Sequence, residues 1–207
     1  RPGIGDLVIF LAFIKKIASK FNSPVSILVK ANSKAEEILK DDRDIDQIIY
    51  LDRRANKKGS HDGLGFFRLV GQIRKHRFDK VFIFNSSLRY RLLAKFAGIK
   101  EIHQYPLGQN KDNVIISAKK LTEKVLGEEV STQPTIDVGQ NLVDAAKAKY
   151  NISKENINIV LGISASGEDK RWFIDRFILT SEKLNKLKPC KFYLAVGKND
   201  KHLIDKI

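Results

Sequence analysis

The chain has 207 residues, of which 43% are hydrophobic and 30% are charged, and its formal net charge is +14. These proportions indicate a globular protein with room for one large or two small domains, and no apolar run is long enough for a membrane-spanning helix. The single cysteine, Cys190, excludes an internal disulfide and is typical of a reducing, cytoplasmic setting.

Short β-rich runs alternate with amphipathic helical stretches along the chain. Strands are predicted at residues 25–29, 47–51, 80–84, 101–105, 157–163 and 191–196. Helices are predicted at about 6–21, 33–40, 64–77, 87–97, 112–126, 137–149, 173–187 and 200–207. This alternation predicts an α/β fold in which a parallel sheet is covered by helices on both faces.

A loop-like stretch, GEEVSTQPTIDVG, interrupts this alternation before the strand–helix pattern restarts. We therefore predict an N-terminal Rossmann-like domain at 1–136, and a linker helix with the start of a second domain at 137–207. The glycine loop at the start has no strand before it, and two parallel strands do not bury both faces of a sheet. The chain is accordingly expected to be truncated at both ends.

Positive charge is concentrated in one part of the sequence. Residues 53–100 hold thirteen Lys and Arg residues against two Asp residues, and so carry +11 of the net +14. Such a field attracts an anionic partner: nucleic acid, an acidic membrane surface or a phosphorylated substrate. No helix-turn-helix, zinc or aromatic β-platform pattern supports nucleic acid. Phe66 and Phe67 are expected in the core because they share helical spacing with the apolar residues after them.

The first loop, RPGIGDLVIF, places Gly3 and Gly5 around a helix start that carries one acid, Asp6. Glycines let a ligand approach the backbone, and the free N–H groups of a helix start favour anions or polar oxygens. Asp6 is either a cap of the first helical turn or a general base beside a substrate hydroxyl. These residues alone favour the cap.

The second loop lies in LGISASGEDKRWF and follows an apolar strand. Its small residues include Ser164, Ser166 and Gly167, and Lys170 and Arg171 are expected at the start of the next helix. A strand, a Ser/Gly loop and a helix start with a lysine commonly hold a diphosphate. The alternative is a solvated helix start, which is less favourable because cations near a helix N-terminus require a compensating anion.

Metal and dinucleotide sites are not supported by the motifs. Four histidines lack metal-ligand spacing, and one cysteine does not build a zinc site. GIGDLV matches only the start of a dinucleotide fingerprint, and the ribose-binding acid expected about twenty residues later is missing. No metal and no cofactor are predicted.

Four segments together carry a family resemblance: GIGD, FDKVFIFNSSLRYRLLAKFAGIKE, SGEDKRWFIDRF and FYLAVGKND. They resemble glycosyltransferase family 9, the heptosyltransferase-like enzymes of lipopolysaccharide core assembly. The resemblance implies a GT-B fold of two Rossmann-like domains, of which the first receives the acceptor and the second binds the nucleotide-sugar. It also implies inverting sugar transfer without a metal.

The resemblance assigns roles to individual residues. Asp6 matches the general base that deprotonates the acceptor, and Lys170 matches the lysine that steadies the donor diphosphate. Ser166 matches a small hydroxyl residue of the donor site. The place of the usual ribose-binding acid is taken by Lys201, and its neighbour Asp200 is expected to serve instead. The full donor set is Ser164, Ser166, Gly167, Lys170 and Asp200.

The implied partners are a nucleotide-sugar, with ADP-heptose as the commonest donor of the family, and an anionic glycolipid acceptor. Acceptor contacts are expected from Gly3, Gly5, Arg53, Arg54, Lys57 and Lys58. A monomer is expected in the cytoplasm, in peripheral contact with the inner face of the inner membrane, and this stretch alone is expected to be inactive. Two alternatives stay open: a nucleic-acid-binding α/β protein that uses the basic block 53–100, and a sugar-nucleotide-processing enzyme that is not a transferase.

Overall fold

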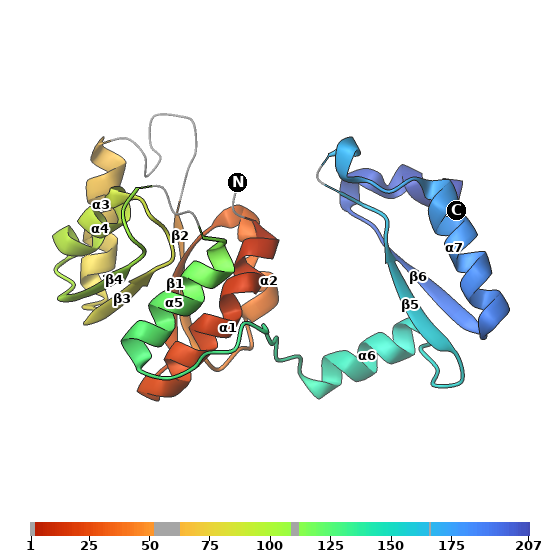
Figure 1. Cartoon of the computed structure of the whole chain (residues 1–207), viewed down its shortest axis with the longest axis horizontal. Helices are drawn as coiled ribbons and strands as arrows, with labels where there is room; N and C mark the ends of the chain where they lie inside the picture. Colours follow the sequence, from red (N-terminus) through yellow and green to blue (C-terminus); the bar gives the residue numbers. More distant parts are fainter. Residues whose placement is uncertain (1–2, 52–62, 109–111, 166) are drawn as a thin grey trace. The chain divides into compact units, whose positions relative to one another are not determined.

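A computed structural model describes residues 3–51, 63–108, 112–165 and 167–207 (Figure 1). The helices are α1 (Ile4–Phe21), α2 (Ala35–Leu39), α3 (Gly63–Lys75), α4 (Leu88–Ala97), α5 (Val114–Leu126), α6 (Gln140–Tyr150) and α7 (Ile174–Leu187). The strands are β1 (Val25–Lys30), β2 (Ile45–Leu51), β3 (Lys80–Ile83), β4 (Glu101–Gln104), β5 (Ile157–Gly162) and β6 (Cys190–Ala195). Short 3-10 helices are η1 (Ala31–Ser33), η2 (Glu168–Lys170) and η3 (Lys198–Lys206). The predicted order of strands and helices is confirmed, and the last predicted helix is the 3-10 helix η3.

The chain divides into two compact units, Arg1–Asp137 and Val138–Ile207. The boundary predicted from the sequence lies between residues 136 and 137. Each unit has strands and helices of its own and is described by itself below.

The first unit contains two parallel strand pairs. β1 pairs with β2, and β3 pairs with β4. The predicted parallel pairing is confirmed, but the described strands of this unit form two two-stranded sheets instead of one continuous sheet. The two pairs nevertheless share a core: Leu28 of β1 packs on the cluster that holds Ile83, and Phe84 packs on the cluster that holds Ile27.

Helix α1 forms because its apolar residues repeat at helical spacing on two adjacent faces. Leu7 and Leu11 face the cluster around β1, whereas Phe13 and Ile17 face the cluster that includes α5. Leu11 and Phe13 are fully buried, and burial of a side chain of this size stabilises a fold by about 1.5–3 kcal/mol. No helix within the described part of the chain is long and apolar enough to cross a membrane.

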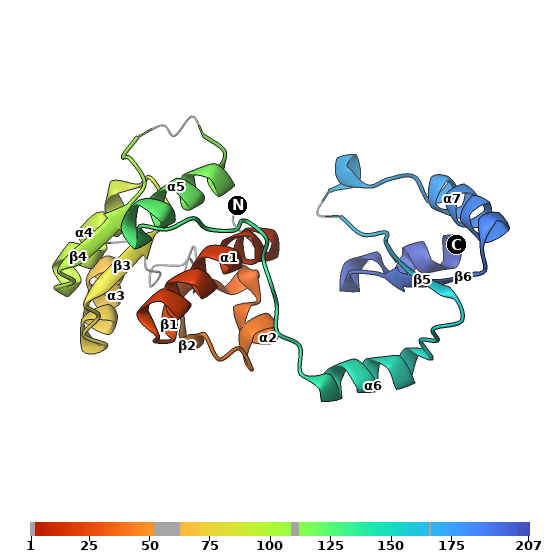
Figure 2. The ribbon, with the colours of Figure 1, turned by 60° about the horizontal axis from the view of Figure 1, so that its bottom comes forward.

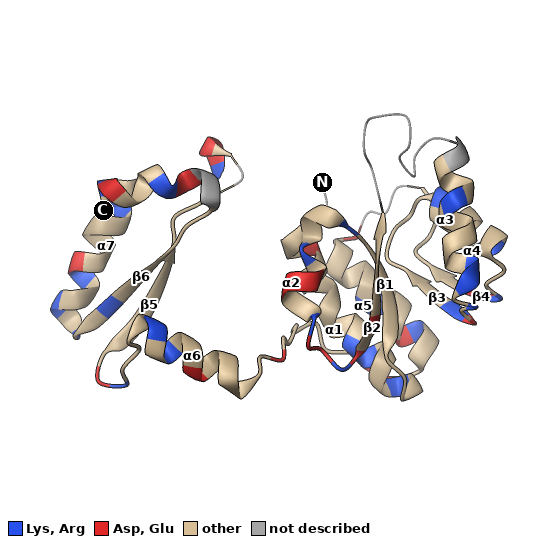
Figure 3. Cartoon of the chain, turned by 180° about the vertical axis from the view of Figure 1, so that it is seen from behind, with Lys and Arg blue, Asp and Glu red and all other residues tan. Residues whose placement is uncertain are grey.

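Helices α3 and α4 lie on the other side of these strands from α1 and α5 (Figure 2). Phe66 packs against the buried cluster formed by α3, α4 and the strands, as expected. The expectation for Phe67 is wrong, because its side chain is 63% exposed. Phe67 lies one residue further along the helix, about 100° around the axis, and so points away from the buried Leu69 and Ile73. Both helices carry exposed Lys and Arg residues, and Figure 3 shows blue Lys and Arg segments along both ribbons.

The second unit is built on β5 and β6, which pair in parallel from Ile157 opposite Cys190 to Gly162 opposite Ala195. α7 packs against β6, and no residue of α6 is buried. Because the strands are parallel and in register, their carboxyl ends lie side by side, and the loops that follow them meet at one edge of the sheet.

Candidate functional site

In the first unit, the predicted turn around Asp6 caps the start of α1. The Gly3 N–H donates to Asp6 Oδ2 at 2.7 Å, which satisfies a backbone donor that has no partner within the helix. This hydrogen bond is the cap that the sequence favoured. In the described part of the chain, the second carboxylate oxygen, Oδ1, has no hydrogen bond, and the Asp6 side chain is half-buried.

The space around the helix start is open. Among the described residues, a Cβ atom placed on Gly5 would meet no atom within 4 Å, and one placed on Gly3 would meet only Asn32 Nδ2, at 3.9 Å. Asp6 is thus fixed through one oxygen and open through the other, an arrangement in which a carboxylate can accept a proton from a neighbouring hydroxyl.

In the second unit, a polar cluster forms where β5 and β6 end. The Gly197 N–H, after β6, donates to Ser164 Oγ, after β5, at 2.7 Å. A Cβ atom on Gly197 would lie 3.5 Å from Ser164 Oγ and 3.7 Å from Asp200 Oδ2, so the glycine allows a close approach of these groups. Ligands of open α/β sheets bind outside the carboxyl ends of the strands, which is where this cluster lies.

An ion pair joins the two loops of this cluster. Arg171 Nη2 lies 2.5 Å from Asp200 Oδ1, and Asp200 is only 8% exposed. Arg171 Nε is buried without a hydrogen-bond partner among the described residues. Asp200, predicted to meet the donor ribose, is therefore held by an arginine through one oxygen, while Oδ2 faces Gly197.

The helix predicted at 173–187 is α7, but the expectation that Lys170 and Arg171 lie at its start is wrong. Lys170 ends the 3-10 helix η2, whose N-cap is Gly167, and α7 starts only at Ile174. Arg171 adopts extended backbone angles, φ −87° and ψ 133°, that interrupt the helix and allow its guanidinium to reach Asp200. The Lys170 side chain is exposed, and no ion pair holds its ammonium within the described residues.

Five predicted site residues lie outside the described residues: Ser166, Arg53, Arg54, Lys57 and Lys58. The predicted donor set did not include Gly197, and Arg171 was expected only beside Lys170 as a cation that requires a compensating anion. Both residues could have been found from their neighbours in the sequence. Gly197 directly follows the apolar run that ends β6, and Arg171 directly follows Lys170.

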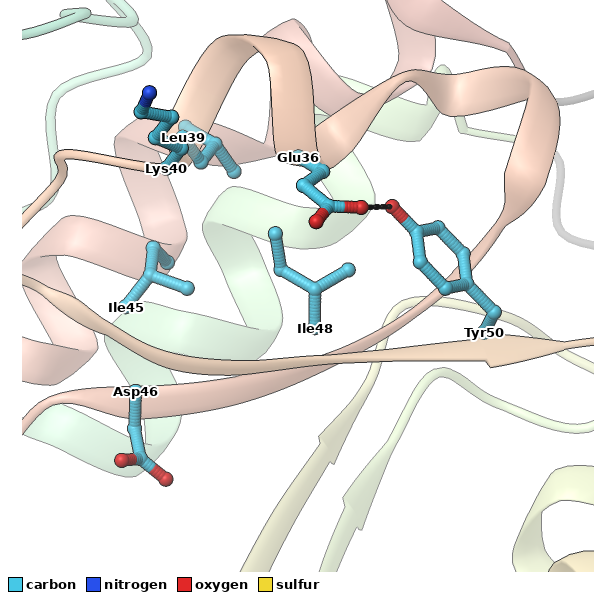
Figure 4. Close-up of a pocket in the computed structure, with 7 residues that line it drawn as sticks. All are labelled: Glu36, Leu39, Lys40, Ile45, Asp46, Ile48 and Tyr50. Atoms are coloured by element: carbon cyan, nitrogen blue, oxygen red, sulfur yellow. Dashed lines mark hydrogen bonds between the residues drawn. The ribbon is translucent and has the colours of Figure 1, made fainter.

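The cavities of the first unit include two that are formed by described residues and lined by no predicted site residue. One, of about 270 Å³, lies between α2 and β2, where the Tyr50 hydroxyl donates to Glu36 Oε2 at 3.3 Å (Figure 4). The other, of about 340 Å³, is lined by Arg91, Gln104, Tyr105, Pro106, Leu107, Asp112, Ser117, Lys120, Leu121 and Lys124. Burial raises the pKa of Tyr105 above its usual range, so its hydroxyl stays neutral and donates to the Val114 carbonyl at 3.1 Å.

Three carboxylates of the first unit, those of Asp42, Asp44 and Asp137, lie close enough to hold a cation. The Lys15 ammonium lies among them, 3.0 Å from Asp42, 4.0 Å from Asp44 and 2.6 Å from Asp137. Burial lowers the pKa of Lys15, but hydrogen bonds to Asp137 and Asp42 outweigh this and raise that pKa above its ordinary value. The Lys15 hydrogen bond holds the pKa of Asp137 below its ordinary value. The single Lys15 ammonium lies within 4.0 Å of all three carboxylates and offsets one of their three negative charges. We interpret the group as a structural ion-pair network.

No protein-family model matches the sequence, and no curated protein does. Solved structures of other proteins share its fold, among them the three that follow. The glycosyl transferase family 9 structure from Veillonella parvula DSM 2008 matches 99% of this chain, with a TM-score of 0.72 and 16% identity. The E. coli ADP-heptose lps heptosyltransferase II matches 99%, with a TM-score of 0.70 and 14% identity. The E. coli heptosyltransferase WaaC with ADP matches 95%, with a TM-score of 0.58 and 12% identity.

The chain spans 63%, 65% and 66% of the lengths of these three structures. The predicted α/β fold of GT-B type is confirmed by this likeness, as is the resemblance to glycosyltransferase family 9 at the level of the fold.

Proposed function

We propose that the protein is a glycosyltransferase that moves a sugar from a nucleotide-sugar to a glycosyl acceptor. The observation that carries the proposal is the fold, which is shared over 95% to 99% of the chain with structures described as glycosyl transferase family 9 and heptosyltransferases. The specific reaction we propose is transfer of heptose from ADP-heptose onto a lipopolysaccharide-core or related glycolipid.

The donor side of the proposed reaction belongs to the second unit. The exposed Lys170 ammonium lies in the loop between β5 and α7 and is suited to a diphosphate, because charge-assisted hydrogen bonds to phosphate are strong. Ser164, Ser166 and Gly167 are proposed to line the same site. Asp200, oriented by Arg171, is proposed to accept a hydrogen bond from a donor ribose hydroxyl.

The acceptor side belongs to the first unit, with Asp6 as general base. As the acceptor oxygen attacks the anomeric carbon, its proton passes to Asp6 Oδ1, while the Gly3 N–H keeps the carboxylate in place through Oδ2. The bond from the anomeric carbon to the diphosphate breaks on the opposite face, so the configuration inverts. The negative charge leaves on the nucleoside diphosphate, where Lys170 stabilises it, and the proposed reaction uses no metal.

The remaining contacts of the proposal concern the acceptor and the membrane. Gly3 and Gly5 leave open space at the helix start for the acceptor. Arg53, Arg54, Lys57 and Lys58 supply positive charge for an anionic glycolipid. The proposed enzyme is a cytoplasmic monomer that works at the inner face of the inner membrane, where such an acceptor is displayed.

The proposal is tested with the full-length protein, ADP-heptose and a lipid A–Kdo acceptor in the presence of a chelator, by following ADP release. We expect release that requires the acceptor. Release without any acceptor would indicate a sugar-nucleotide-processing enzyme, and no release with ADP-heptose or any other nucleotide-sugar would contradict the proposal.

Donor binding gives an independent test of the site. Lys170→Ala is expected to raise the KM for the donor roughly tenfold to hundredfold, since a hydrogen bond to a charged group contributes about 1.5–3 kcal/mol. Lys186→Ala, on α7, removes an exposed lysine of the same unit and is the matched control. Equal KM values in both variants would remove Lys170 from the donor site.

A further inference from the structure

Helices α3 and α4 of the first unit expose a continuous apolar surface, which we call the α3–α4 stripe. It consists of Leu88, Leu92 and Phe96 of α4 and Phe67 of α3, which are 52%, 38%, 48% and 63% exposed. The Phe67 and Phe96 rings are in contact, with centroids 6.5 Å apart, so the stripe passes from one helix to the other.

The stripe is a separate face of these helices from the one that forms the core. Leu88, Leu92 and Phe96 follow one another at intervals of four residues and so lie on one side of α4. The other side of α4 carries Leu93 and Ala97, which are 4% and 7% exposed and belong to the buried cluster. Phe67 and Phe96 touch the core through their ring contacts with Phe66, and a large part of each stripe side chain stays exposed.

The stripe is surrounded by positive charge. The two helices carry six Lys and Arg residues and no Asp or Glu: Arg68, Arg74, Lys75, Arg89, Arg91 and Lys95. Figure 3 shows these cations on both helices. Arg74 is anchored at the stripe itself, since its Nη2 donates to the Phe96 carbonyl at 2.5 Å, and Arg89 lies over the Phe66 ring, 5.0 Å from its centroid.

We propose that the α3–α4 stripe docks on the surface of an anionic bilayer. Exposed Phe and Leu side chains flanked by Lys and Arg are the pattern of surfaces that lie in a membrane interface, where the apolar groups enter the acyl boundary and the cations meet lipid phosphates. Charge complementarity favours an anionic bilayer as the partner. Its lipid phosphates pair with the cations, and its acyl chains take up the apolar side chains. A nucleic acid would meet the cations and leave the leucines exposed to water.

This inference deepens the proposed function, because a glycolipid acceptor lies in a membrane, but the docking itself requires neither donor nor acceptor. It is tested by co-sedimentation of the full-length protein with phosphatidylcholine vesicles, and with vesicles in which roughly a third of that lipid is replaced by phosphatidylglycerol. We expect binding to the anionic vesicles, weak binding to the neutral ones, and loss of binding as salt is raised.

The decisive variant is Phe67→Ser combined with Phe96→Ser, with Leu187→Ser as control. Leu187 lies on α7 of the second unit and is 79% exposed, so its substitution removes a comparable exposed apolar side chain elsewhere. We expect the double variant to bind anionic vesicles at least roughly tenfold more weakly, because two apolar side chains no longer enter the interface, and the control to bind normally. Unchanged thermal unfolding of the first unit establishes that the double variant is folded.

A second double variant tests the contribution of the positive charge without altering the apolar side chains. Arg91→Glu combined with Lys95→Glu leaves the apolar residues in place and should also weaken binding to anionic vesicles. Equal vesicle binding by the wild-type protein and both double variants would overturn the proposal. Tight binding of single- or double-stranded nucleic acid that the same variants abolish, without vesicle binding, would replace it with the nucleic-acid alternative. Transfer to a water-soluble acceptor analogue is measured alongside, so a failure of glycosyl transfer is distinguished from a failure of docking.

Discussion

The ion pair between Arg171 and Asp200 is expected to stabilise the second unit by joining its two loops. Their charged atoms lie 2.5 Å apart, and the side chains are 23% and 11% exposed. Two unit charges attract by about 4 kcal/mol at 4 Å and an effective dielectric constant of about 20, and desolvation offsets part of this. Arg171→Met should therefore lower the free energy of unfolding by about 2–3 kcal/mol, because it leaves a nearly buried carboxylate without its partner.

A double-mutant cycle measures the pair directly. Arg171→Met, Asp200→Asn and the double variant are unfolded in urea, and the fluorescence of Trp172, the only tryptophan, reports on the second unit. We expect a coupling energy of about 1.5–2 kcal/mol between the two sites. The exposed pair of Asp144 and Lys147 on α6, 3.8 Å apart, is the control and should show little coupling. Additive effects of Arg171→Met and Asp200→Asn would refute the reasoning.

The ion pairs around Lys15 should make the free energy of unfolding of the first unit depend on pH, with losses at both low and high pH. Asp137 has a pKa below its ordinary 3.8, so its contribution is present above that pH and is lost as pH falls through the folded-state value. Lys15 has a pKa above its ordinary 10.5, so its contribution is complete below that pH and is lost as pH rises through the folded-state value. Unfolding measured across pH tests this, and an acid limb unaltered by Asp137→Asn would contradict it. Separately, Asn113→Ala should lower the unfolding free energy by about 1 kcal/mol, since its side chain accepts the Ile115 N–H at 2.9 Å. Ser87→Ala removes an N-cap residue with no such bond and should change little, so equal losses would count against this cap.

The order of the elements could be predicted because its signals are local. Each strand is a short apolar run, and helices end where the backbone enters the left-handed region. Asn22 has φ 46°, Gly98 has φ 86° and Gly127 has φ 70°, at the C-caps of α1, α4 and α5. Asn and Gly tolerate this conformation better than other residues, so the sequence itself marks these helix ends.

The polar cluster of the second unit could not be predicted in the same way. Arg171 and Asp200 are 29 residues apart, and Ser164 and Gly197 are 33 apart. Both contacts depend on the parallel alignment of β5 with β6, which no local pattern specifies. Lys170 and Arg171 were expected at the start of the helix at 173–187 and do not lie there for the same reason, because the extended backbone at Arg171 serves a tertiary contact.

Two adjacent phenylalanines show a further limit of periodicity. Phe66 and Phe67 both fall near the apolar face of α3, and the sequence does not say which one points inward. In the structure Phe66 packs on the core and Phe67 is 63% exposed, with its ring against Phe96 of the neighbouring helix. The exposed member of the pair is the one that the membrane proposal uses.

Asp6→Asn tests most directly the proposal that Asp6 is the base of a glycosyl transfer. An asparagine can still accept the Gly3 N–H, so the cap and the thermal stability should persist while the proton acceptor is lost. Asp175→Asn, in the first turn of α7, is the matched control. We predict that acceptor-dependent ADP release by the full-length protein collapses by at least roughly a hundredfold in Asp6→Asn and is unchanged in Asp175→Asn. Equal rates in the wild-type protein and in Asp6→Asn would contradict the claim and leave Asp6 as a helix cap.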